Sequence, residues 1–182
     1  MVHSFPTRRS SDLAADHRYV WLNQYSNPGN WITHYQQTAP AIAKQFPDLA
    51  VLFVGSGTTG TLMGCARYFA ENGAQVQIVA VDAVGSVTFA PPGEPARPRL
   101  IPGLGMGVRP PLLDAQYVDD VVLIDEPETV ATCHRLAARG FLFGGSTGTV
   151  VAGALRWLKE HRLATRTGED GVAAREIGRA HV

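Results

Sequence analysis

The chain has 182 residues, of which 45% are hydrophobic and 18% are charged, and its formal net charge is zero. This is the composition of one medium-sized soluble domain. A neutral chain lacks the basic surface typical of nucleic-acid binding, and no apolar run approaches the roughly 20 residues of a membrane span. We therefore expect neither nucleic acid nor a membrane as a partner. With no apolar signal-peptide core at the N-terminus, the expected location is the cytoplasm.

The two cysteines, Cys65 and Cys133, fall inside helical patterns and have no CxxC partner. In a reducing compartment this favours buried free thiols over a metal site or a disulfide.

The two ends of the chain look foreign to the rest. The segment 3–13 and the segment 177–182, with the last base of the Glu176 codon, can be encoded by sequences that each contain one of two reverse-complementary stretches, as in the adapters of sequencing libraries. We therefore expect residues 1–13 and 176–182 to be artefacts and residues 14–175 to form one lobe of a longer protein. The alternative is a pair of natural polar tails.

An apolar–aromatic run at His17–Leu22 is expected to be the end of a strand, and 23–30 is a loop by composition. Three further apolar runs are predicted as strands: Leu49–Val54, Val76–Val81 and Val118–Ile124. Apolar residues at helical spacing predict four helices: Ile32–Phe46, Leu62–Ala70, Val130–Ala137 and Val150–Leu158.

Pro40 must kink the first predicted helix or lie in a first turn. Asn72 and Gly73 end the second helix, Asp125 caps the third and Gly140 ends it. Strands that alternate with helices indicate an α/β fold with a parallel, doubly wound sheet. The long Pro- and Gly-rich stretch 83–111 is expected to be a functional or mobile loop.

The most informative stretch is the turn Gly55–Thr61, which links a predicted strand to a helix. It fits GxGxxG, and Asp82 follows 22 residues after Gly60, as in a dinucleotide-binding fingerprint. The missing Gly-Lys-Ser/Thr excludes a P-loop. Three threonine hydroxyls in the turn, however, suit the three oxygens of a terminal phosphate. A dinucleotide, a monophosphate and a turn without a ligand all remain open at this point.

Two further glycine clusters, 103–107 and 144–148, are expected to converge on the first turn. The second of them also follows an apolar run, Phe141–Phe143, and opens a helix. In a parallel sheet, turns of this kind lie together at the carboxyl ends of the strands, where ligands bind.

These segments together resemble the cysteine synthase/cystathionine β-synthase family of pyridoxal-phosphate enzymes, known as fold type II. The chain contains the counterparts of five family segments in order: Asn23–Pro28 (NQxxNP), His34 with Thr38–Pro40, Gly57–Thr61 (GTGGT), Gly103–Gly105 (GIG) and Gly144–Gly148 (GGSxG). The match runs through nearly all of 14–175. It implies a tryptophan synthase β-like parallel sheet, of which this chain holds an incomplete part.

The resemblance implies pyridoxal 5'-phosphate as the cofactor. Its phosphate would be bound by the turn residues Gly57, Thr58, Thr59, Gly60 and Thr61. Ser146 would face the pyridine nitrogen, which favours elimination to an aminoacrylate over transamination. The alternative role for Ser146 is the N-cap of the last helix.

Two other polar residues have local interpretations. Asp82 is more simply a strand-end residue than a ribose ligand, and His34 a helix residue that makes local hydrogen bonds.

The lysine that holds this cofactor in the family has no counterpart here. Lys44 and Lys159 are the only lysines, and neither adjoins a glycine turn, so both are expected on the surface. We therefore expect no catalytic residue in the chain and no activity from it alone.

Residues 82–87 and 99–105, with Thr59 in the phosphate turn, look most like the branch that joins O-phosphoserine to glutamate for siderophore synthesis. The resemblance implies small amino-acid substrates and a homodimer of the full-length enzyme. Cysteine synthase, with sulfide as the nucleophile, is the nearest alternative. An NAD-binding domain and an inactive regulatory homologue are the others. Three loop arginines, which are Arg97, Arg99 and Arg109, are either solvated or ligands of a phosphate or carboxylate.

Overall fold

A computed structural model describes residues 18, 20 and 22–161. The expected artefacts at 1–13 and 176–182 lie outside the described residues. Three residues of the predicted strand end, which are His17, Tyr19 and Trp21, also lie outside them. The remaining residues of that segment, Arg18, Val20 and Leu22, form no strand.

The sheet has three parallel strands in the order β1-β2-β3, with β1 at Val51–Gly55, β2 at Gln77–Ala83 and β3 at Asp120–Ile124. All three predicted strands are confirmed, although β3 begins two residues later than expected. The strands end nearly level, since Gly55 pairs with Val81 and Ala83 pairs with Ile124. The connections that follow them therefore emerge at one edge of the sheet.

The helices are α2 (Gly29–Thr33), η1 (His34–Thr38), α3 (Ala39–Gln45), α4 (Gly60–Glu71), η2 (Ala115–Tyr117), α5 (Glu126–Ala137) and α6 (Gly145–Glu160). The first three form one continuous helical segment, in which η1 is a π-helical turn and the Ala39 N–H bonds the His34 carbonyl. Pro40 lies in the first turn of α3. The wider turn accommodates a residue that has no N–H to donate, as the sequence suggested.

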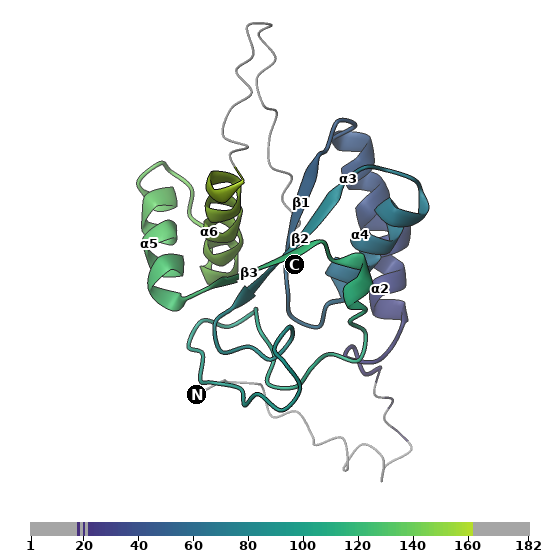
Figure 1. Cartoon of the computed structure of the whole chain (residues 1–182), viewed down its shortest axis with the longest axis horizontal. Helices are drawn as coiled ribbons and strands as arrows, with labels where there is room; N and C mark the ends of the chain where they lie inside the picture. The colour runs from purple at the N-terminus through teal and green to yellow at the C-terminus, as the bar shows by residue number, and fades with distance from the viewer. Residues whose placement is uncertain (1–17, 19, 21, 162–182) are drawn as a thin grey trace, which may run out of the picture.

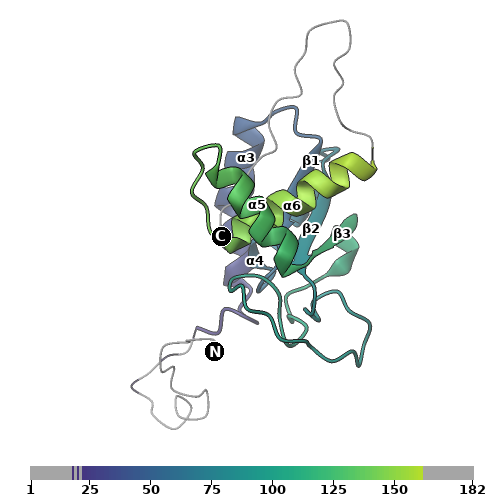
Figure 2. The same cartoon turned by 90° about the vertical axis from the view of Figure 1, so that its left-hand side faces the viewer.

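Helices cover both faces of the sheet (Figure 1). The side chains of Leu52, Val54, Ile78 and Ala80 pack with α3 and α4, whereas Phe53, Val79 and Val81 pack against α6 on the opposite face. Figure 2 shows α6 crossing the sheet with α5 beside it. Burial on both faces explains why the strands are continuous apolar runs. Within the described part of the chain, none of the helices has the length and apolarity needed to cross a membrane.

The prediction for α5 was right about its start and partly right about its buried face, where Cys133 and Leu136 are half-buried. The Asp125 side chain accepts a hydrogen bond from the Glu128 N–H at 2.8 Å, so the predicted cap is confirmed. The buried residues are Thr129 and Thr132, however, while Val130 is 46% exposed. This face packs against α6, where the Thr129 and Thr149 hydroxyls lie 2.9 Å apart. Threonine has the shape of valine, so what it adds to this contact is a hydroxyl that can form a buried hydrogen bond between the two helices.

The long loop between β2 and β3 lies beyond the carboxyl ends of the strands (Figure 1). Its fold is fixed by internal hydrogen bonds, such as Arg99 Nη1 to the Gly85 carbonyl at 2.6 Å and Val87 N to the Met106 carbonyl at 2.9 Å. Arg99 therefore acts as a structural residue of the loop.

Candidate functional site

The first glycine turn spans the four residues between β1 and α4. Ser56 is fully buried, and its N–H bonds the Val81 carbonyl at 2.9 Å, which holds the turn on the sheet edge. Its hydroxyl has no hydrogen-bond partner among the described residues. Thr59, at the N-cap position of α4, has φ of +66°, which is unusual for a β-branched residue. The turn therefore presents a helix N-terminus whose first N–H groups have no partner within the helix.

The three glycine clusters converge, as the sequence predicted. The Gly105 N–H bonds the Ser56 carbonyl at 2.8 Å. A side chain at Gly57 would place its Cβ 3.3 Å from the Gly103 carbonyl oxygen, and one at Gly103 would place its Cβ 3.5 Å from the Ser146 Cβ. The cluster 103–107, called the loop cluster below, thus lies between the turns that open α4 and α6 and contacts both.

Ser146 lies in the first turn of α6 and is half-buried. The N-cap is Gly144, so the alternative interpretation of Ser146 as the cap is wrong. The Ser146 hydroxyl forms no hydrogen bond within the described structure, which leaves it available at the point where the clusters meet.

The run that precedes the second glycine turn is not a strand. Gly140 takes a left-handed conformation, and the Phe141 N–H bonds the Leu136 carbonyl at 3.0 Å. Gly140 and Phe141 therefore form the C-terminal cap of α5. The expectation that both turns follow strands holds only for the first turn.

Two polar side chains from the N-terminal helical segment reach the first turn. Asn30 Nδ2 donates to the Thr58 hydroxyl at 3.1 Å, and the ring Nε2 of His34 lies 3.2 Å from the Thr61 hydroxyl. The other ring nitrogen of His34 lies 2.9 Å from the Thr38 hydroxyl, so the predicted local bond exists beside a second, long-range one. Burial lowers the pKa of His34, which favours the neutral ring.

Sequence reasoning missed Ser56, Asn30 and the long-range contact of His34. Asn30 and His34 are four residues apart and so share one helix face, but spacing cannot say which element that face meets.

Asp82 lies at the end of β2 and is fully buried. Its Oδ1 accepts from the Ala83 N–H at 2.8 Å. Burial raises its pKa, against the opposing effect of the Ser86 and Thr88 hydroxyls and of Arg99. A buried carboxyl cannot reach a ribose, which supports the strand-end interpretation of Asp82 over a dinucleotide ligand.

Both lysines are exposed in the last turns of helices, Lys44 in α3 and Lys159 in α6. Thirteen residues of helix, about 20 Å, separate Lys159 from Ser146. The described residues also contain no group of three or more His, Cys, Asp or Glu side chains that could hold a metal ion.

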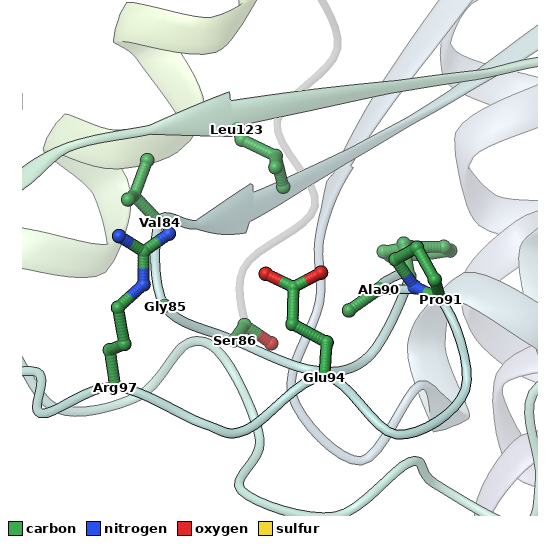
Figure 3. A pocket seen from close by; sticks show the side chains of 9 residues that line it. Val84, Gly85, Ser86, Ala90, Pro91, Glu94, Arg97 and Leu123 are labelled. Atoms are coloured by element: carbon green, nitrogen blue, oxygen red, sulfur yellow. The ribbon is translucent and has the colours of Figure 1, made fainter.

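A hollow of about 150 Å³ lies beside the loop that follows β2. Val84, Leu123, Glu94 and Arg97 are among its lining residues (Figure 3). Ser86 joins this hollow to the loop cluster, because its hydroxyl accepts from the Met106 N–H at 2.9 Å.

Comparison with known proteins shows which family and which relatives this chain resembles. The sequence profile of the family described as pyridoxal-phosphate dependent enzyme matches residues 3–173. N-(2-amino-2-carboxyethyl)-L-glutamate synthase of Cupriavidus metallidurans is 43% identical over 135 residues, which cover 73% of this chain and 39% of that protein. The protein of the same name from Ralstonia nicotianae is 41% identical over 149 residues, covering 80% and 43%. The chain therefore spans about two fifths of the length of these curated relatives.

The fold has a counterpart among solved structures. A crystal structure of O-ureido-L-serine synthase superposes with a TM-score of 0.75 at 31% sequence identity, covering 91% of this chain and 58% of that one. A three-stranded parallel sheet with helices on both faces is thus the part of that architecture present here.

Proposed function

The chain belongs to the family of pyridoxal-phosphate dependent enzymes, and we propose that it is the lobe that binds the cofactor phosphate in an enzyme of β-replacement on activated serine. The observation that carries this proposal is the convergence of three glycine clusters on a threonine-rich helix N-terminus. The names of the relatives support it, since one is a synthase of N-(2-amino-2-carboxyethyl)-L-glutamate and another of O-ureido-L-serine.

The residues of the first turn fit a phosphate. Gly57 lets the loop cluster approach the turn closely, since a Cβ at this position would lie 3.3 Å from the Gly103 carbonyl oxygen. The unpaired N–H groups and positive dipole end of α4 favour negative charge there. The hydroxyls of Thr58 and Thr61 add donors, while Thr59 turns the chain into the helix and Gly60 begins it. These five positions, 57–61, are the proposed phosphate site.

Ser146 is proposed to meet the cofactor ring on its nitrogen side. The bound cofactor supplies an electron-withdrawing ring that lets a leaving group depart from the β-carbon of an amino acid. A serine hydroxyl can donate or accept at the ring nitrogen, so it does not hold a proton there as a carboxylate would. The position of Ser146 next to Gly103 places this hydroxyl where the second turn meets the loop cluster.

The covalent lysine has no candidate near the site, because both lysines of the chain lie at distant helix ends. We therefore expect the 182-residue chain to bind the cofactor phosphate and to have no activity of its own. The full-length enzyme is proposed to be a cytoplasmic homodimer of the siderophore-precursor branch that uses O-phosphoserine and glutamate. Cysteine synthase, with lyase-type release of acetate before sulfide addition, is the alternative.

Titration of the chain with pyridoxal 5'-phosphate tests the proposal, with the amide NMR signals of 57–61 as the readout. We expect shifts with pyridoxal phosphate, and none with NAD or with pyridoxal, which lacks the phosphate. Thr58→Val should weaken binding about tenfold, whereas Thr132→Val, a buried threonine of α5, should leave it unchanged. Equal binding of pyridoxal or tighter binding of NAD would overturn the proposal.

The branch is tested on the full-length enzyme. Release of phosphate from O-phosphoserine that requires glutamate supports the siderophore-precursor branch. Turnover of O-acetylserine with sulfide, and none with glutamate, would establish the cysteine synthase alternative.

A further inference from the structure

Two pairs of residues belong to the contact between the N-terminal helical segment and α4 and lie beside the first turn. Asn30 and His34 are one helical turn apart on α2 and η1, and Gly60 and Gly64 are one turn apart on α4. A side chain at Gly60 would collide with the Asn30 amide, and one at Gly64 would place its Cβ 2.5 Å from the His34 Cβ. The absence of side chains at Gly60 and Gly64 therefore lets Asn30 and His34 reach the threonines.

Asn30 contacts the turn as a hydrogen-bond donor. Its amide group donates to the Gln24 carbonyl at 2.7 Å and to the Thr58 hydroxyl at 3.1 Å. The Gly60 N–H also points to the Thr58 oxygen, at 3.4 Å. A threonine hydroxyl has a single hydrogen, and both of these neighbours are donors, so that hydrogen remains free for another acceptor.

His34 can leave the Thr61 hydrogen free or occupy it, depending on its tautomer. With the proton on Nε2, the ring donates to Thr61 and accepts from the Thr38 hydroxyl. With the proton on Nδ1, the ring instead takes the Thr61 hydrogen for itself. An anion at the turn needs that hydrogen and therefore selects the Nε2–H form. The lowered pKa of His34 keeps the ring neutral, so the choice between tautomers is the relevant one.

We propose that Asn30 and His34 are positioning residues that donate to Thr58 and Thr61 and so direct both threonine hydrogens toward the bound phosphate. The inference rests on the proposed function, because it assumes that the turn binds a phosphate. Neither residue needs to touch the cofactor, and both act through the threonine that each contacts.

The first test is the tautomer of His34, read from its ring ¹⁵N chemical shifts with pyridoxal 5'-phosphate as the probe. We expect the Nε2–H form to become the major form on binding. A bound chain that keeps the Nδ1–H form would overturn the inference for His34.

The second test is a set of substitutions with the dissociation constant of pyridoxal phosphate as the readout. His34→Asn cannot reach Thr61 and should weaken binding about tenfold. His34→Gln places a donor where Nε2 was and should largely restore binding. His134→Asn, the same change on the exposed face of α5, should have no effect.

A double-mutant cycle separates positioning from general destabilisation. If His34 acts through Thr61, then His34→Asn combined with Thr61→Val should weaken binding no more than Thr61→Val alone. Additive losses would overturn the inference. Asn30→Asp replaces the donor with an acceptor and adds a negative charge that repels the phosphate, so it should weaken binding by more than tenfold, while the urea midpoint monitors folding.

The two proposals fail in different ways. If the unsubstituted chain does not bind pyridoxal phosphate, the proposed function fails and this inference fails with it. If the unsubstituted chain binds and His34→Asn binds equally well, only the inference is overturned.

Discussion

The two glycine turns that open α4 and α6 look alike in sequence but are supported by different means. The first continues a buried strand, and the N-terminal helical segment holds it through Asn30 and His34. The second turn follows the end of α5 and not a strand. The left-handed conformation of Gly140 sets the direction in which the chain enters this turn. A glycine turn thus has no fixed support of its own, and neighbouring elements decide how rigidly it is held.

Gly64→Ala should break the support of the first turn and have the largest effect. The new Cβ would lie 2.5 Å from the Trp31 carbonyl oxygen and 2.7 Å from the Tyr35 nitrogen, and backbone atoms cannot move aside easily. We expect a loss of about 3 kcal/mol in the free energy of unfolding, measured by urea denaturation. Gly144→Ala is the control, because nothing lies within 4 Å of its Cβ position. Equal stability of the two variants would contradict the close packing of α4.

Thr149→Val should weaken the support of the second turn. The Thr149 hydroxyl donates to the half-buried Gly145 carbonyl at 3.0 Å and lies 2.9 Å from the Thr129 hydroxyl in a buried contact. Its removal should cost about 1.5 kcal/mol of unfolding free energy. Thr33→Val removes a similar bond to a helix carbonyl, but at an exposed site, and should cost much less. A smaller loss for Thr149→Val than for Thr33→Val would show that α5 does not fasten α6.

Gly140→Ala should test whether the end of α5 sets the direction of the second turn. Gly140 has φ of +86° and no atom within 4 Å of its Cβ position, so any cost arises from the backbone alone. We expect a loss of about 1 kcal/mol. Thermal denaturation of this variant beside Gly144→Ala provides the measurement, since Gly144 has an ordinary φ of −77°. Indistinguishable melting temperatures would contradict the role of the left-handed cap.

The two cysteines should show a difference in packing between α4, which follows the first turn, and α5, which precedes the second, without any change in stability. Burial raises the pKa of Cys65 on α4 to about 12, so its thiol stays protonated at pH 8. Cys133 on α5 is only half-buried, which corrects the expectation of two buried thiols. A thiol reagent at pH 8 should label Cys133 at least about a hundredfold faster than Cys65, since the thiolate is the reactive form.

The labelling is followed by mass spectrometry, and Cys133→Ser is the control that should leave the chain almost unlabelled. Equal labelling of both cysteines in the folded chain would show that α4 is not packed as described.

Sequence patterns predicted most of this fold because the relevant forces are local or periodic. The strands were found as apolar runs since both sheet faces are covered, and Asp125 was found as a cap because capping depends on the next three residues. The face of α5 was predicted only in part, because apolar spacing found the half-buried Cys133 and Leu136 but pointed to the exposed Val130 and missed the buried Thr129 and Thr132.

What the sequence by itself determined is the order of strands and helices, the glycine turns, and the threonines at 58, 59 and 61, although the Thr59 hydroxyl donates to the Thr58 carbonyl at 2.7 Å. These depend on backbone conformation and on residue chemistry within a few positions. The tertiary structure alone decided that the loop cluster lies between the turns and that His34 bonds Thr61, 27 residues away. Such contacts depend on how helices pack across a sheet, and no spacing along the chain encodes the distance between two packed helices.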